Sequence, residues 1–202
     1  MTRNPLRPLS ALAVLLLLGG FAAGCGQKTE TTENTTTDST AMGGTMAPAL
    51  SDANIAAIVV AANDADIEAG QMAESKTKNA DVKQFAQTMQ TDHKAVNEKA
   101  KDLAGRLNLN PEDNDASRQL KDSSERMRDS LKTMDGAAFD RAYIDNEVTY
   151  HQAVLDMLDS QLIPSAQNAE LKQLLNDTRP AIAQHLDHAK QVQAKLGASS
   201  SR

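Results

Sequence analysis

Residues 144–158 read IDNEVTYHQAVLDML, and this stretch decides the fold class. Ile144, Val148 and Leu155 are spaced by four and seven residues, the spacing that places side chains on one face of an α-helix. The same helical spacing continues along the chain from Ser51, and no segment shows the alternation of apolar and polar residues typical of a β-strand. The sequence therefore predicts an all-α protein.

Four long amphipathic helices and one shorter helix are predicted between Ser51 and residue 197. Ser51, Asn79 and Asn168 are residues of the kind that cap helix N-termini. The long helices are predicted over residues 51–75, 79–107, 135–163 and 168–197, and the shorter, mostly polar helix over residues 115–134. Short links join the long helices in pairs, which is typical of an up-down four-helix bundle, and the polar helix then forms a crossover between the second and the third.

Two prolines fall within the predicted helices. Pro164 is expected to end the third long helix at Ile163, because the residue before a proline is disfavoured in the α region. Pro180 lies inside the fourth long helix, where it removes a backbone hydrogen bond and clashes with the preceding turn, at a cost of about 3 kcal/mol. We therefore expect the fourth helix to kink or restart near Pro180.

The N-terminal segment is typical of an export signal. Residues 1–24 combine a short basic start, an apolar run and small residues before Cys25, and the cleavage site is similar to a bacterial lipobox. The apolar run is too short for a transmembrane helix, which needs about 20 residues. We expect Cys25 to be acylated, with Gly26 favouring an outer-membrane lipoprotein that faces the periplasm. The alternative is a secreted periplasmic protein whose signal is cleaved without lipidation.

The residues between the signal and the bundle are too polar to fold. Residues 25–50 hold the lipidated cysteine and a run rich in threonine, which cannot bury enough apolar surface to offset the loss of chain entropy. We interpret them as a disordered tether, and we interpret residues 198–202 as a disordered tail. The folded domain is then predicted over residues 51–197.

Charge and composition exclude some partners. The chain has a formal net charge of −6, and removing residues 1–24 takes away Arg3 and Arg7 but no acid. Nucleic-acid binding depends on cationic groups that neutralise phosphates, so this charge disfavours it. The membrane is expected to be contacted through acylated Cys25, and a protein partner is left open but unidentified.

Polar residues interrupt the apolar faces of the long helices. His93, His151 and His185 fall on the inward faces of three different helices, and Asp66 and Glu147 add carboxylates on the buried side. Neutral imidazole and carboxylate groups that project inward from facing helices are how bundles bind transition metals. These five residues are our candidate metal ligands, and one transition-metal ion is the candidate cofactor. A structural network, in which the histidines hydrogen-bond to carboxylates, tyrosines or water, explains the same pattern without a ligand.

Four segments of the chain carry a family resemblance. They are residues 66–73 (DIEAGQMA), residues 85–89 (FAQTM) leading into Asp92 and His93, residues 139–143 (FDRAY) followed by His151, and residues 179–186 (RPAIAQHL). Together they resemble a bacterial envelope family described as domain of unknown function 4142. The resemblance covers about residues 52–195. It implies a ferritin-like helical bundle in the cell envelope and no particular chemistry.

Three functions follow as hypotheses. The first is a lipid-anchored periplasmic bundle, not itself an enzyme, that binds one transition-metal ion. The second is an envelope interaction or stress-response module, in which surface acids such as Asp122, Glu125 and Asp129 bind a partner and the histidines form a structural network. The third is a ferritin-like redox enzyme, which is disfavoured because Gln90, Val148 and Ile182 stand where a Glu-x-x-His motif would place glutamate. No catalytic residues are assigned.

Overall fold

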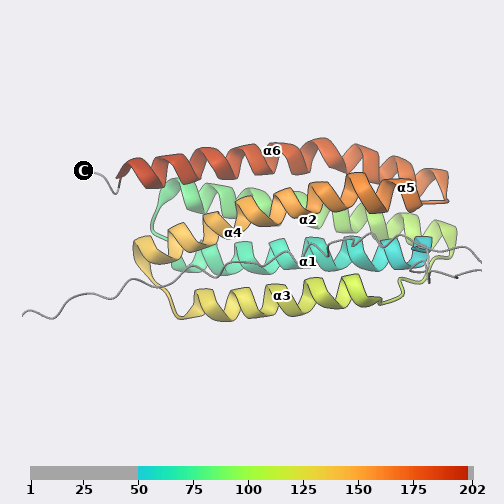
Figure 1. Cartoon of the computed structure of the whole chain (residues 1–202), viewed down its shortest axis with the longest axis horizontal. Helices are drawn as coiled ribbons and strands as arrows, with labels where there is room; N and C mark the ends of the chain where they lie inside the picture. The colour runs from blue at the N-terminus through green and yellow to red at the C-terminus, as the bar shows by residue number, and fades with distance from the viewer. Residues whose placement is uncertain (1–49, 200–202) are drawn as a thin grey trace, which may run out of the picture. The chain divides into compact units, whose positions relative to one another are not determined.

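A computed structural model describes residues 50–199 of the chain, with side chains to residue 198 (Figure 1). The predicted signal peptide, Cys25 and the tether lie outside the described residues. The helices are α1 (Asp52–Lys76), α2 (Ala80–Leu107), α3 (Asp115–Lys132), α4 (Gly136–Met157), a π-helical turn η1 (Leu158–Leu162), α5 (Ile163–Ser165) and α6 (Ala169–Ser199). The described chain contains no strand, so the prediction of an all-α bundle is confirmed.

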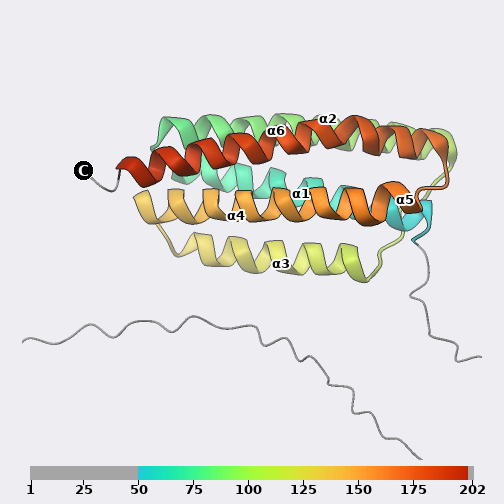
Figure 2. The same ribbon diagram turned by 45° about the horizontal axis from the view of Figure 1, so that its top comes forward.

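Four long helices form the bundle, and α3 lies outside it. Helix α1 packs along α2, α2 along α6, α6 along α4, and α4 along α1 (Figures 1 and 2). Neighbouring helices of this square run antiparallel, and α3 covers α1 as the predicted crossover between α2 and α4. Among the described residues, no helix combines the length and apolarity needed to span a bilayer.

Polar caps fix the helix boundaries close to those predicted. Ser51 forms a capping box with Asn54 at the start of α1, and Asn79 accepts hydrogen bonds from two backbone N–H groups at the start of α2. The Asn168 side chain does the same at the start of α6. These bonds satisfy N–H groups that have no partner inside the helix.

The predicted stop before Pro164 is wrong. The helix continues through Pro164 to Ser165, because the turn before the proline widens into a π-helix. In that turn Ile163 N–H donates to Leu158 O, five residues earlier, which makes room for the proline ring. Helix α6 likewise runs through Pro180 without restarting and ends at Ser199, two residues into the predicted tail.

The apolar core is divided into two clusters with a polar layer between them. One cluster holds Phe85, Tyr143 and Ile144, all 0% exposed, and the other holds Ile55 and Leu175 among others. Along α4, Glu147 and His151 fall between Ile144 of the first cluster and Leu155 of the second. The bundle therefore buries a layer of polar side chains mid-way along its length, with an apolar cluster on either side of the layer.

A close approach of α1 and α2 depends on Gly70. A Cβ atom at this position would lie 2.9 Å from the backbone oxygen of Ala86. Replacing Gly70 with alanine should destabilise the protein by about 1 kcal/mol, because overpacking costs roughly 1–3 kcal/mol and helix propensity returns about 1. Chemical denaturation checks this. The matched control is Gly105→Ala in α2, where nothing lies within 4 Å of the added Cβ and a small gain in stability is expected.

Candidate metal centre

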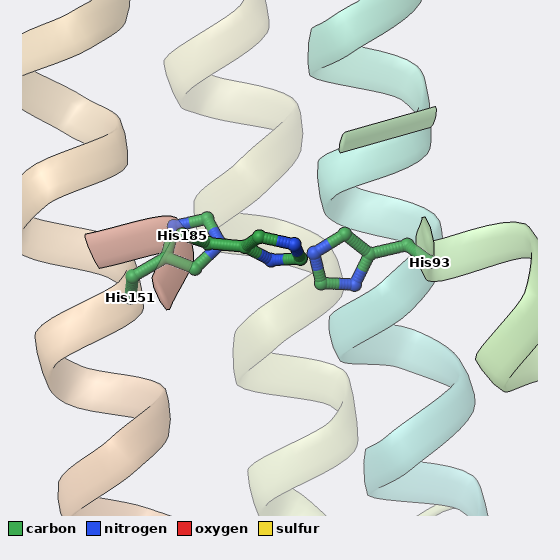
Figure 3. Close-up of side chains that lie close together, drawn as sticks. All are labelled: His93, His151 and His185. Atoms are coloured by element: carbon green, nitrogen blue, oxygen red, sulfur yellow. The ribbon is translucent and has the colours of Figure 1, made fainter. Parts of the chain in front are cut away.

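Three histidines from three helices meet in the polar layer. His93 comes from α2, His151 from α4 and His185 from α6, and their side chains point toward one another (Figure 3). Their ring centroids are 5.3–5.8 Å apart. One ring nitrogen of each lies within 4.8 Å of the ring nitrogens offered by the other two. The residues are 2%, 0% and 5% exposed, so water does not compete for these atoms.

Each imidazole is oriented by one hydrogen bond from its outer ring nitrogen, the nitrogen that faces away from the other two histidines. The inner ring nitrogen faces them. His93 Nδ1 donates to Asn63 Oδ1 at 2.7 Å, and His151 Nδ1 donates to the backbone oxygen of Glu147 at 3.0 Å. His185 Nε2 donates to Asp92 Oδ2 at 2.9 Å. All three acceptors are oxygens, so each ring carries its proton on the outer nitrogen and presents a lone pair on the other.

The acceptor behind His93 is itself fixed by an amide chain. Asn63 Nδ2 donates to Asn97 Oδ1 at 2.9 Å, and Asn97 Nδ2 donates to Asp64 Oδ1 at 2.8 Å. Because the Asn63 nitrogen is committed to Asn97, its oxygen must face His93. This chain determines which tautomer His93 adopts.

The inner ring nitrogens have no hydrogen-bond partner. His93 Nε2, His151 Nε2 and His185 Nδ1 are buried and unpaired within residues 50–199. Buried polar atoms almost always find a partner, so three unpaired atoms at one point require an explanation. Three converging imidazole lone pairs are the donor set that a transition metal binds.

Two buried carboxyl groups lie beside the histidines. Asp66 Oδ2 on α1 is 3.4 Å from His93 Nε2, and Glu147 Oε2 is 3.4 Å from His151 Nδ1. Asp66, Glu147 and His151 also form a group whose candidate ligand atoms lie within 4.8 Å of one another. His151 therefore belongs both to this acidic group and to the three-histidine group.

Burial sets the protonation of the site. It lowers the pKa of His93 well below the usual value, and the neighbouring His151 and His185 add to the shift. It also lowers the pKa of His185, although Asp92 opposes this. Burial raises the pKa of Glu147 to about 8 and raises that of Asp66 as well. The His93 and His185 imidazoles are therefore neutral at neutral pH and available as ligands without losing a proton.

The five candidate ligands named from the sequence, Asp66, His93, Glu147, His151 and His185, all lie in this layer. The fourth histidine, His188, is outside it and packs edge-on against Phe85, with ring centroids 5.2 Å apart. Sequence reasoning missed Asn63 and Asn97, and it named Asp92 only beside His93 in the family resemblance. A signal was present for two of them, since Asn97 follows His93 by four residues and Asn63 precedes Asp66 by three.

Comparison with known proteins supports the fold. The family model described as domain of unknown function (DUF4142) matches residues 37–192, most of the chain, and the chain belongs to this family. None of the curated proteins matches it. A solved structure titled "CopM in the Cu(II)-bound form" has a similar fold, with a TM-score of 0.56 and 17% sequence identity. The match covers 73% of this chain and 98% of that one. At this identity, the similarity shows a common fold.

Proposed function

We propose that this DUF4142 protein binds one transition-metal ion inside its bundle, through His93 Nε2, His151 Nε2, His185 Nδ1 and the Asp66 carboxylate. One observation carries the proposal. In each of the three histidines of the polar layer, the outer nitrogen is paired with an oxygen and the inner nitrogen has no hydrogen-bond partner within residues 50–199. Metal-binding histidines characteristically donate their second N–H to such an oxygen, which orients the ring and fixes the tautomer.

A purely structural network accounts less well for this arrangement. Such a network would stabilise the fold by pairing its buried polar atoms, since an unpaired buried group costs about 1–3 kcal/mol. Three of the buried side-chain atoms without a partner in the described chain are the inner histidine nitrogens, whereas Glu147 has Asp66 and Tyr143 as hydrogen-bonding neighbours. A bound ion would satisfy those three nitrogens at once.

Copper(II) is the ion we favour. Imidazole suits copper, zinc, nickel and iron, and among divalent ions of the first row copper(II) binds nitrogen ligands most tightly. The Cu(II)-bound title of the similarly folded CopM agrees with this choice. Bonds of about 2.0–2.1 Å would bring the three nitrogens closer together than in the present arrangement, where they lie within 4.8 Å of one another.

The role we propose is binding and not catalysis. The nearby polar groups are the hydrogen-bond partners described above, and the Glu-x-x-His spacing of ferritin-like oxidases is missing from the sequence. We further propose that the protein holds its ion at the periplasmic side of the outer membrane, anchored through acylated Cys25. This compartment is proposed from the sequence alone.

The test is a titration of chelator-treated protein with Cu(II), combined with elemental analysis of protein purified without chelators. We expect one equivalent per chain and an electron paramagnetic resonance spectrum with nitrogen hyperfine splitting from imidazole ligands. If the protein takes up no stoichiometric copper, zinc or nickel, the proposal fails and the structural network is the better account.

The oxygens that accept hydrogen bonds from the outer histidine nitrogens should also affect the affinity for the metal. Replacing Asp92 with alanine removes the acceptor of His185 Nε2, so the ring can place its proton on the inner nitrogen. We expect Cu(II) affinity to fall about tenfold, as is usual when such a partner is lost. Competition with a chelator of known affinity measures it. Asp102→Ala, at an exposed position of the same helix, is the control and should leave affinity unchanged.

A further inference from the structure

A cavity connects the polar layer with the surface. It lies between α1, α3 and α4 and has a volume of about 270 Å³. Ser123, Thr149 and Ala153 lie at its rim and are exposed, whereas Asp66 and Glu147 also line it and are 3% and 1% exposed. The cavity therefore runs from solvent to the two carboxyl groups, and it is wide enough for several water molecules at about 30 Å³ each.

The position of α3 explains why the cavity exists. Helix α3 packs mainly along α1 and makes few contacts with α4. It is tied to α1 by the ion pair of Arg128 with Glu68 at 2.7 Å, and Lys76 donates to the backbone oxygen of Lys132 at 2.8 Å. Because α3 has few contacts with α4, the cavity opens along the seam between these two helices.

The cavity is suited to a cation. Its lining, all within the described residues, includes two acids and no lysine or arginine. Glu147 is buried with Asp66 and Tyr143 as its hydrogen-bonding neighbours, and its Oε2 makes no hydrogen bond of standard geometry within residues 50–199. Together with Asp66 and His151 it can offer an ion oxygen and nitrogen ligands before the three-histidine group is reached.

The other approaches to the three-histidine group are less suited to an ion, because a second cavity that reaches His93 and Asp66 has a volume of only about 40 Å³ and a mostly apolar lining. The outer nitrogens of His93 and His185 are bound by Asn63 and Asp92, so an ion arriving from there would have to break those hydrogen bonds. His151 is the residue that the acidic group and the three-histidine group share. His151 therefore links the acidic group to the three-histidine group.

We propose that Asp66, Glu147 and His151 form a second cation site, an entry site at the floor of the α1–α3–α4 cavity, through which the metal ion reaches the three histidines. This inference rests on the proposed function. It adds a separate claim, because binding at equilibrium does not depend on the route, whereas the rates of loading and release do.

The experiment measures those rates by stopped flow, with Cu(II) as the probe. The protein has two tyrosines and no tryptophan, and the Tyr150 ring lies 6.0 Å from that of His151. Copper arrival should therefore quench tyrosine fluorescence. Release is followed after adding excess chelator, and the dissociation constant is measured separately by competition.

Narrowing the rim of the cavity should slow metal loading and metal release by the same factor. Replacing Ala153 with leucine is expected to lower the loading and release rates about tenfold each, so that the dissociation constant stays the same. Ser123→Leu, on the α3 side of the cavity, should have the same effect on both rates. It serves as a second variant in case Ala153→Leu folds poorly. Ala138→Leu is the matched control, since Ala138 is also exposed on α4 but lies about 22 Å along the helix.

The role of Glu147 as a ligand at the entry site is tested separately. Glu147→Gln keeps the shape of the side chain but removes the carboxylate that would bind the ion, and loading should slow about tenfold because the cavity floor then offers one ligand fewer. Wild-type loading rates in Ala153→Leu and Ser123→Leu, or in Glu147→Gln, would overturn the entry site even if copper binds. Loss of affinity without slower release would also overturn it. If wild-type protein binds no metal, the proposed function itself has failed.

Discussion

Replacing His151 with glutamine is expected to reduce Cu(II) affinity by at least about 100-fold, more than loss of an outer hydrogen-bond partner would. His151 is the residue common to the three-histidine group and the acidic group, so its loss removes a ligand from both. Glutamine has a similar volume, and the apolar residues around this fully buried position should remain packed. Competition titration and the disappearance of nitrogen hyperfine splitting measure the effect.

The control is His188→Gln, which alters the one histidine outside the polar layer. It removes an imidazole from α6, the helix that also carries His185, and should leave affinity and spectrum unchanged. Circular dichroism establishes that both variants are folded. Equal affinities for the two variants would show that histidines bind copper non-specifically, and the site we describe would then be wrong.

The fold could be predicted from sequence because its determinants are local. Helical spacing identified the long helices, and Ser51, Asn79 and Asn168 marked their starts, since an N-cap bonds to backbone groups two or three residues away. The predicted helix end before Pro164 was wrong because the effect of a proline on a helix depends on the geometry of the preceding turn. A π-helical turn relieves the clash, and no residue preference announces such a turn.

The inward histidines were also accessible to sequence reasoning, but their protonation was not. Helical periodicity places His93, His151 and His185 on buried faces whatever the partners are. The tautomers depend on hydrogen bonds between residues far apart in the chain, such as that of His185 with Asp92, 93 positions away. The unpaired inner nitrogens, and with them the strongest argument for a metal, are a property of the assembled bundle.

The cavity could not be predicted from the sequence, for a related reason. A polar helix was expected to lie outside the bundle, and α3 does. Whether it seals against α4 depends on side-chain sizes along a seam between two helices. Small residues there, such as Ser123 and Ala153, have many uses in a helix and do not indicate an opening.

Without metal, the protein should lose about 2 kcal/mol of unfolding free energy between pH 6.5 and 8.5, or roughly 4–8 °C in Tm. Burial raises the pKa of Glu147 from 4.5 to about 8 in the folded state. In this range the folded protein holds a proton that the unfolded chain has released, so stability falls as the pH rises. Asp66, whose pKa is also raised, acts in the same direction.

Within this pH window, the two histidines with lowered pKa values oppose the carboxyl groups only near its lower end. Burial lowers the pKa of His93 and His185 from 6.5, so their folded forms bind fewer protons than the unfolded chain and they cost stability as the pH falls below 6.5. There they oppose the carboxyl groups, and the pH profile should flatten. Burial also raises the pKa of Tyr143 and Tyr150 above 10, which keeps both phenols protonated throughout.

Glu147→Gln isolates the carboxyl contribution, because glutamine cannot titrate. We expect the variant to lose most of the slope between pH 6.5 and 8.5, with the remainder due to Asp66, when thermal unfolding is followed in the presence of chelator. An undiminished slope would mean that Glu147 is ionised in the folded protein. A bound divalent ion stabilises ionised carboxylates, so saturating Cu(II) should reduce the slope in wild-type protein if the ion binds beside Asp66. The pH dependence of stability, measured with and without Cu(II), therefore reports the protonation of Glu147 and whether the metal binds next to the carboxyl groups.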